Sequence, residues 1–286
     1  MKNEVRYCTT EDGVRIAYCV EGEGPPLLLS HNPYAFSLSH LVPALDKAIH
    51  RIGRGRKLIR FDLRGTGLSQ AVEDVSPTVL VRDVEAIVAA LNLERFILFG
   101  VAFGGPRAIE YAARHPDFVE GLVLYDTFPR FTDAFPLQVS QALPLLCRGN
   151  WKLATRTFAD AGVRRQDELE GLRWAEMIEQ SLTGEMMARL IESHTPLDVT
   201  GLLPRIECPT LVCHSRNDGM YPFTFGQKMA EIIPNARLVP LVGDPAGPFS
   251  NTDLAVRALE TAMQAVDAIF PPLTTVPGAG AVNQRS

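Results

Sequence analysis

Hydrophobic residues fall along this chain in short unbroken runs that alternate with longer periodic stretches. The runs are "LLLS" (27–30), "RFILFG" (95–100) and "VEGLVLYD" (119–126). Consecutive apolar positions are typical of strands that are covered on both faces. Between two of the runs, residues 76–91 carry apolar positions at helical spacing after a Ser-Pro start signal. This alternation of strand and helix predicts a doubly wound, mostly parallel sheet.

The first segments of the chain follow a different pattern. "EVRYCTT" and "GVRIAYCVEG" are rich in β-branched and aromatic residues, and they flank Asp12-Gly13, which is a two-residue turn signal. An antiparallel hairpin should therefore precede the parallel part. Counting this pair, we expect an α/β fold with an eight-stranded sheet.

The alternation stops near Phe128 and resumes near Cys208, and the stretch between them is helical in character. Because it follows a strand, it should lie at the carboxyl edge of the sheet, where such folds bind ligands. We interpret it as a helical lid. The predicted division is a core domain of residues 1–127 and 204–270, a lid of residues 128–203, and a flexible Pro- and Gly-rich tail of residues 271–286.

Composition narrows the classes of function. The chain has 286 residues, of which 46% are hydrophobic and 21% charged, with a formal net charge of -5. These values are typical of a globular protein and give no basic field for nucleic acid, so we interpret the arginine-rich stretch 50–60 as a solvated loop that leads into a strand. No apolar window is long enough to cross a membrane and no secretory leader is evident. We expect a cytoplasmic protein without a membrane partner, and a homodimer stays open.

The five cysteines give no sign of a metal or disulfide framework. Their number is odd, they form no Cys-x-x-Cys pair, and no histidine has zinc-binding spacing. The glycines of "GVAFGG" do not have the spacing of a dinucleotide fingerprint. We therefore expect neither a metal nor a cofactor.

Four motifs, in this order and spacing, resemble the α/β-hydrolase fold family over about residues 5–270. They are "DLRGTGLS" (62–69), "GVAFGGP" (100–106), "AARHP" (112–116) and "HSRNDGMYP" (214–222). The resemblance, which is greatest to bacterial members with a lid, implies a Ser-His-acid triad with the serine on a tight strand-to-helix elbow.

The chain departs from that family pattern at the two residues that would do the chemistry. Ala102 stands at the elbow position of the serine, and a methyl group cannot attack a carbonyl. In "VGDPAGPFS" (242–250), Ala246 stands where the resemblance places the histidine, and no histidine follows position 214. Loss of either residue abolishes triad chemistry, because the parts act as a unit. We favour natural divergence over a laboratory substitution.

The oxyanion hole departs as well. The resemblance implies one backbone N–H from Phe103 and a second from the residue after a His-Gly pair. The sequence instead reads "SHNP" (30–33), in which Asn32 replaces the glycine and Pro33 has no N–H to donate.

Three residues could still move protons in this pocket. Asp218 matches the family acid and is either a relic that accepts turn N–H groups or a general base. Asp126, at the end of a strand, is either an acid or a cap for the start of the lid. His31 either braces its loop, which we prefer, or acts in catalysis. His194, in the lid, could face the pocket, but its direction stays open.

The residues expected to contact a ligand surround the elbow and the entrance to the lid. They are Asn32, Pro33, Tyr34, Ala102, Phe103, Phe128, Trp151 and Ala246, with Phe36, Phe131, Phe135 and Trp174 as further members of an aromatic chamber of which about half should touch the ligand.

Three functions remain open. The first, which we favour from sequence, is a non-hydrolytic enzyme of lyase, cyclase or isomerase type that acts on a small apolar organic molecule. The second is a ligand-binding pseudo-hydrolase without turnover. The third is an ester or lactone hydrolase inactivated at Ala102.

Overall fold

The computed structural model describes residues 4–33, 37–38, 41–163, 168–243 and 252–273. Its centre is one sheet of eight strands in the order β1-β2-β4-β3-β5-β6-β7-β8. The strands are β1 (Arg6–Thr9), β2 (Arg15–Glu21), β3 (Pro26–Ser30), β4 (Lys57–Phe61), β5 (Phe96–Val101), β6 (Val119–Tyr125), β7 (Thr210–Ser215) and β8 (Ala236–Leu241). The β1–β2 and β2–β4 pairs are antiparallel and all others are parallel. The predicted mostly parallel sheet is confirmed.

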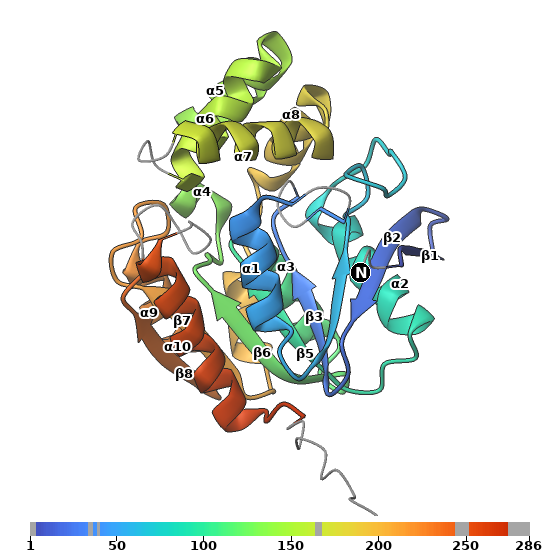
Figure 1. Ribbon diagram of the computed structural model, residues 1–286, viewed down its shortest axis with the longest axis vertical. Helices are drawn as coiled ribbons and strands as arrows, with labels where there is room; N and C mark the ends of the chain where they lie inside the picture. Colours follow the sequence, from blue (N-terminus) through green and yellow to red (C-terminus); the bar gives the residue numbers. More distant parts are fainter. Residues whose placement is uncertain (1–3, 34–36, 39–40, 164–167, 244–251, 274–286) are drawn as a thin grey trace, which may run out of the picture.

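Helices cover both faces of the sheet (Figure 1). The helices α1 (Pro43–Ile52) and α10 (Asp253–Ile269) contact each other on the near face in this view. The helices of the other face are α2 (Pro77–Ala90), α3 (Gly104–Arg114) and α9 (Phe223–Ile232). The 3-10 helix η1 (Thr200–Arg205) contacts both α3 and α9. The strands between these layers read as unbroken apolar runs because neither of their faces meets water.

In the described part of the chain, five helices form an insertion between β6 and η1, above the sheet in Figure 1. They are α4 (Phe131–Ala134), α5 (Leu137–Gly149), α6 (Trp151–Val163), α7 (Glu168–Ser181) and α8 (Gly184–His194). The closest pairings within the insertion are α5 with α8 and α6 with α7. We call residues 131–194 the helical insertion.

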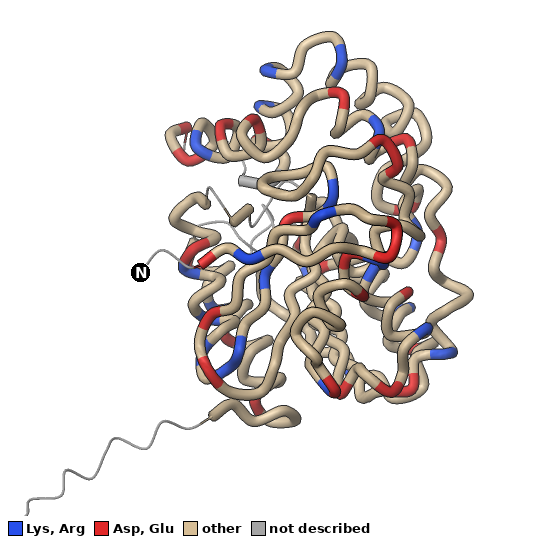
Figure 2. Tube along the Cα trace, turned by 90° about the vertical axis from the view of Figure 1, so that its right-hand side faces the viewer, with Lys and Arg blue, Asp and Glu red and all other residues tan. Residues whose placement is uncertain are grey.

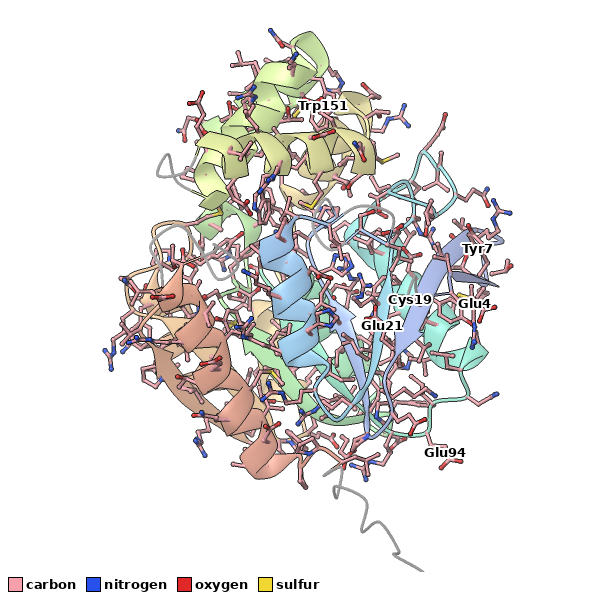
Figure 3. All side chains as sticks on the ribbon, in the orientation of Figure 1. Glu4, Tyr7, Cys19, Glu21, Glu94 and Trp151 are labelled. Carbon is pink, nitrogen blue, oxygen red and sulfur yellow. The ribbon has the colours of Figure 1, made fainter. Side chains whose placement is uncertain are left out.

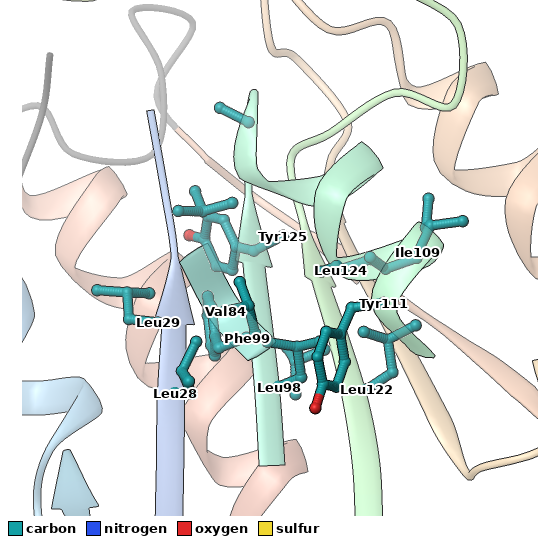
Figure 4. Packing of buried hydrophobic residues seen from close by; sticks show 14 of the residues in the cluster. Leu28, Leu29, Val84, Leu98, Phe99, Ile109, Tyr111, Leu122, Leu124 and Tyr125 are labelled. Carbon is teal, nitrogen blue, oxygen red and sulfur yellow. The ribbon is translucent and has the colours of Figure 1, made fainter. Parts of the chain in front are cut away.

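The core lies where the central strands meet α2 and α3. Leu98 and Phe99 of β5 and Leu122 and Leu124 of β6 are inaccessible to solvent, and Ile109 of α3 packs near them (Figure 4). Burying each of these side chains contributes about 1.5–3 kcal/mol. The core therefore fixes the carboxyl ends of β5 and β6, from which the candidate site is built.

Two local expectations were wrong. Residues 10–14 connect β1 to β2, so the turn is longer than the two-residue form: Thr10 and Val14 exchange hydrogen bonds across it and Gly13 has a φ of 82°.

The arginine-rich stretch is not a fully solvated loop. Arg56, in the loop, is buried and donates to Asp267 and to the Phe270 carbonyl. Arg60 lies in β4, in the segment predicted to be a strand, and is buried beside Glu21. Charged partners on distant segments make this burial tolerable, and they are invisible to a local pattern.

The expectations about charge, metal and membrane can be compared with the described residues only. Acidic and basic positions are interspersed along the trace (Figure 2). Over that part of the chain, all five cysteines are free and no cluster of three metal-ligating side chains occurs. None of the described helices is both long and apolar enough to cross a membrane. Most of the predicted tail, residues 274–286, lies outside the described residues.

Candidate functional site

The turn between β5 and α3 keeps the shape of a nucleophile elbow although it carries no nucleophile. Ala102 has a φ of 48°, in the left-handed region that L-residues rarely adopt. Its carbonyl accepts from the N–H of Gly105 at 3.0 Å and from Oγ1 of Thr127 at 2.5 Å. These contacts fix the backbone of Ala102, the residue at which the sequence resemblance expects the serine.

Glycines allow this elbow to pack against the neighbouring strands. A Cβ on Gly104 would lie 2.1 Å from the carbonyl oxygen of Ser30 in β3. A Cβ on Gly105 would lie 1.9 Å from Oγ1 of Thr127. The repeated glycines of the elbow motif are therefore explained by close packing.

The N–H of Phe103, which the resemblance assigns to the oxyanion hole, already has a side-chain partner within the fold. The N–H of Phe103 donates to Oδ1 of Asn32 at 2.9 Å. Pro33 follows Asn32 and has no N–H of its own. The structure thus brings Asn32 and Phe103 together, but as partners of each other. A substrate carbonyl would have to displace the carboxamide to reach this donor.

His31 is buried between a main-chain carbonyl of its own loop and that of the last residue of β4. Nδ1 lies 2.6 Å from the carbonyl of Asn32, and Nε2 lies 2.7 Å from the carbonyl of Phe61. Burial lowers the pKa of His31 to about 4, so a neutral ring at pH 7 can donate to only one of the two. The buried Arg107 holds the same loop by donating to the His31 carbonyl at 2.8 Å and to Ser30 Oγ at 3.1 Å. The geometry suits a brace, and a catalytic role stays a prediction.

The two candidate carboxyl groups lie at the ends of β6 and β7. Asp126 is inaccessible to solvent, has a φ of 38°, and accepts from the N–H of Ser215 at 2.6 Å and from its Oγ at 2.8 Å. Oδ1 of Asp218 accepts from the N–H groups of Met220 and Tyr221. Its Oδ2 is buried and has no hydrogen-bond partner among the described residues.

Burial raises the pKa values of both carboxyl groups. The pKa of Asp126 rises to about 7 because its desolvation outweighs the two bonds from Ser215. The pKa of Asp218 rises to about 6, first through burial and then through the nearby charge of Asp126. Two such groups titrate as a pair, and one of them can carry a proton at neutral pH.

A cavity of about 190 Å³ lies between the elbow and the helical insertion. Its described wall consists of Pro33, Phe103, Phe131, Phe135, Val139, Leu143, Thr157, Phe158, Ala161, Met187, Leu190, Ile191, His194 and Met220. Pro33 and Phe103 were predicted to contact a ligand, and Phe131 and Phe135 to belong to the aromatic chamber. Phe103 directly follows Ala102 of the elbow, and Pro33 directly follows its partner Asn32, so the cavity abuts the elbow. Met220 lies two residues after Asp218.

Other predicted contact residues do not belong to this described wall. Phe128 is buried behind it and packs edge-on to Phe103. Ala102 is buried at the elbow, and Trp151 lies in the helical insertion, labelled in Figure 3. The predicted contacts Tyr34 and Ala246 lie outside the described residues. The carboxyl groups of Asp126 and Asp218 and the ring of His31 are also absent from the described wall.

Sequence reasoning missed the part of the wall that α8 provides. Met187, Leu190, Ile191 and His194 follow one another at spacings of three, one and three residues, which places them on one helix face. That stripe was a readable signal for a lining face. Its direction toward the elbow depends on the packing of α8 against α5, which no local pattern reveals.

The comparisons with known proteins agree with this architecture. The AB hydrolase superfamily protein YisY of Bacillus subtilis is 28% identical over 260 residues, covering 85% of this chain and 92% of that protein. A cis-3-alkyl-4-alkyloxetan-2-one decarboxylase of Shewanella oneidensis is 28% identical over 271 residues, covering 82% and 80%. The crystal structure of a hydrolase from Pseudomonas aeruginosa has a TM-score of 0.78 at 23% identity, covering 93% and 98% of the two chains. The family model for the alpha/beta hydrolase fold matches residues 27–250, and the chain belongs to that family.

Proposed function

We propose that this protein binds a small apolar organic molecule beneath its helical insertion and does not hydrolyse it. The observation that carries the proposal is the hydrogen bond from the Phe103 N–H to Asn32 Oδ1. An oxyanion donor accelerates acyl transfer only when it is aimed at a developing charge, and one donor contributes about 10²–10³ in turnover. Here the donor already has a neutral partner within the fold.

The remaining chemistry of the elbow supports the same conclusion. Ala102 supplies no nucleophile, and the sequence has no histidine after position 214 to act as its base. The cavity beside the elbow is walled mainly by hydrophobic side chains. Such a wall provides affinity for an apolar molecule, and its described residues include neither a serine nor a cysteine. The helical insertion then acts as a lid over a binding chamber.

A second candidate is a non-hydrolytic enzyme, and one observation favours it. Oδ2 of Asp218 is buried, lacks a described partner, and belongs to a carboxyl whose pKa is raised to about 6, which suits a general base near neutral pH. One similar protein is named as a decarboxylase, so related chains include chemistry other than hydrolysis. The described cavity wall comes within two residues of Asp218 at Met220 but does not include its carboxyl.

Mass spectrometry of small molecules retained by the purified protein separates these candidates. Any captured compound is incubated with fresh protein and with Asp218→Asn. We expect it to be recovered unaltered from both proteins. A compound that is converted by the unmodified protein and spared by Asp218→Asn would overturn binding without turnover and establish the second candidate.

The third reading, a hydrolase disabled at one position, has its own test. We expect Ala102→Ser to release no 4-nitrophenol from 4-nitrophenyl acetate above the rate of the unmodified protein. A lone serine lacks a base, and loss of the base by itself costs about 10⁶ in turnover. The double variant Ala102→Ser/Asn32→Gly, which frees the Phe103 N–H, should also be inactive. Ester hydrolysis by Ala102→Ser alone would contradict the proposal.

A further inference from the structure

His194 presents a fixed hydrogen-bond acceptor to the cavity. It ends α8, is 7% exposed, and belongs to the described wall. Its Nδ1 lies 2.7 Å from the carbonyl oxygen of Leu190 and 3.2 Å from Oγ of Ser193. Because a carbonyl can only accept, Nδ1 must carry the hydrogen. In a neutral ring, Nε2 then carries no hydrogen and has a lone pair that can accept a hydrogen bond.

That lone pair is available to a ligand. Nε2 of His194 has no hydrogen-bond partner within the described part of the chain, whereas the other ring nitrogen is held by the helix. Burial lowers the pKa of His194 to about 4, so the ring stays neutral at physiological pH. A ligand hydroxyl beside this nitrogen would donate to it.

The other polar groups of the described wall have already donated their hydrogens. The hydroxyl of Thr157 donates to the carbonyl of Leu153 at 2.9 Å. The N–H of Phe103 donates to Asn32, as described above. The described wall therefore offers lone pairs where a hydrolase offers donors. This polarity suits a ligand hydroxyl and disfavours a ligand whose polar atom is only a carbonyl oxygen.

We infer that the ligand is a small lipophilic alcohol or phenol whose hydroxyl donates to Nε2 of His194. The inference rests on the proposed function and names its ligand class. A cavity of about 190 Å³ exceeds the roughly 150 Å³ of an engineered apolar cavity that holds benzene. A single substituted ring is therefore of suitable size. The rings of Phe131 and Phe135, stacked at 5.1 Å, give it an aromatic wall.

A calorimetric cycle with two ligands and three proteins tests the hydrogen bond. The ligands are 4-ethylphenol and 4-ethyltoluene, in which a methyl replaces the hydroxyl. The proteins are the unmodified chain, His194→Phe, which keeps an aromatic ring without the acceptor, and the matched control Thr157→Val. We expect the phenol-to-toluene affinity ratio to fall about three- to tenfold in His194→Phe and to stay unchanged in Thr157→Val.

The failures of the inference and of the proposed function give different results. If both ligands bind and their affinity ratio is the same in all three proteins, the hydrogen bond is absent and binding of an apolar molecule stands. A ratio that falls in Thr157→Val instead overturns the assignment to His194. If neither ligand binds the unmodified chain, the proposed function fails at this cavity.

A spectroscopic measurement on the unmodified protein covers the case in which His194→Phe does not fold. The ¹⁵N resonance of His194 Nε2 should move upfield when 4-ethylphenol binds, because the lone pair accepts a hydrogen bond. It should keep its position with 4-ethyltoluene. Equal shifts with both ligands would overturn the inference.

Discussion

The elbow after β5 and the acid loops after β6 and β7 share one edge of the sheet but treat their polar groups differently. At the elbow the oxyanion N–H of Phe103 has Asn32 as its partner, and the Ala102 carbonyl has two donors. At the acid loops, Oδ2 of Asp218 is buried without a described partner, and its pKa is raised toward neutrality.

Under the proposed function, this difference describes two ways in which polar groups of a hydrolase-like site can be left without their usual reaction. Where a buried polar group finds a new partner, as the Phe103 N–H does in Asn32, the site becomes stable and inert. Where no partner occurs among the described residues, as at Asp218 Oδ2, burial of the polar atom is costly and raises the pKa of its carboxyl. We therefore expect the contribution of the elbow to stability to depend on close packing. The contribution of the acid loops should depend on pH.

The largest effect should come from crowding the elbow. Gly104→Ala places a Cβ 2.1 Å from the Ser30 carbonyl, which is backbone and cannot rotate away. We expect a loss of about 4 kcal/mol in the free energy of unfolding, measured by urea denaturation. Gly149→Ala is the matched control because its Cβ would meet nothing within 4 Å. Equal stability of the two variants would mean that the elbow is not packed against β3.

The acid loops should give the next effect, as a dependence of stability on pH. Asp126 in the folded protein keeps its proton up to a pKa of about 7, whereas an unfolded Asp loses it near 4. Between these values the folded state binds more protons, so the free energy of unfolding falls as pH rises. We expect the fall between pH 4 and 8 to be smaller in Asp126→Asn by on the order of 2 kcal/mol.

The measurement for this second prediction is a series of denaturation curves at each pH. Asn at position 126 can keep both contacts with Ser215, so a change in slope reports the lost titration. Asp117→Asn, at an exposed position, is the control and should leave the slope unchanged. Identical slopes for the unmodified protein and Asp126→Asn would show that this carboxyl titrates as in the unfolded chain.

The sequence predicted the sheet well because its signals are local. Unbroken runs such as residues 95–100 need only a few neighbours to be recognised as buried strands. The candidate site was harder to predict from the sequence, because its contacts join segments that are far apart in the chain. Asn32 lies 71 positions from Phe103, so the missing glycine of the motif was visible but the new hydrogen bond was not. For the same reason the direction of His194 could not be read before α8 was placed.

The smallest effect should come from relieving the backbone at the elbow itself. Ala102 has a φ of 48°, which costs an L-residue about 1 kcal/mol and costs glycine nothing. Ala102→Gly should therefore raise the free energy of unfolding by less than about 1 kcal/mol, because the added freedom of the unfolded chain offsets part of the gain. Asn92→Gly, at a φ of 47°, is the control and should gain less, since asparagine tolerates this region better than alanine. A net loss in Ala102→Gly would mean that the Ala102 methyl group contributes more through packing than its backbone costs, and the elbow would then have adapted to alanine.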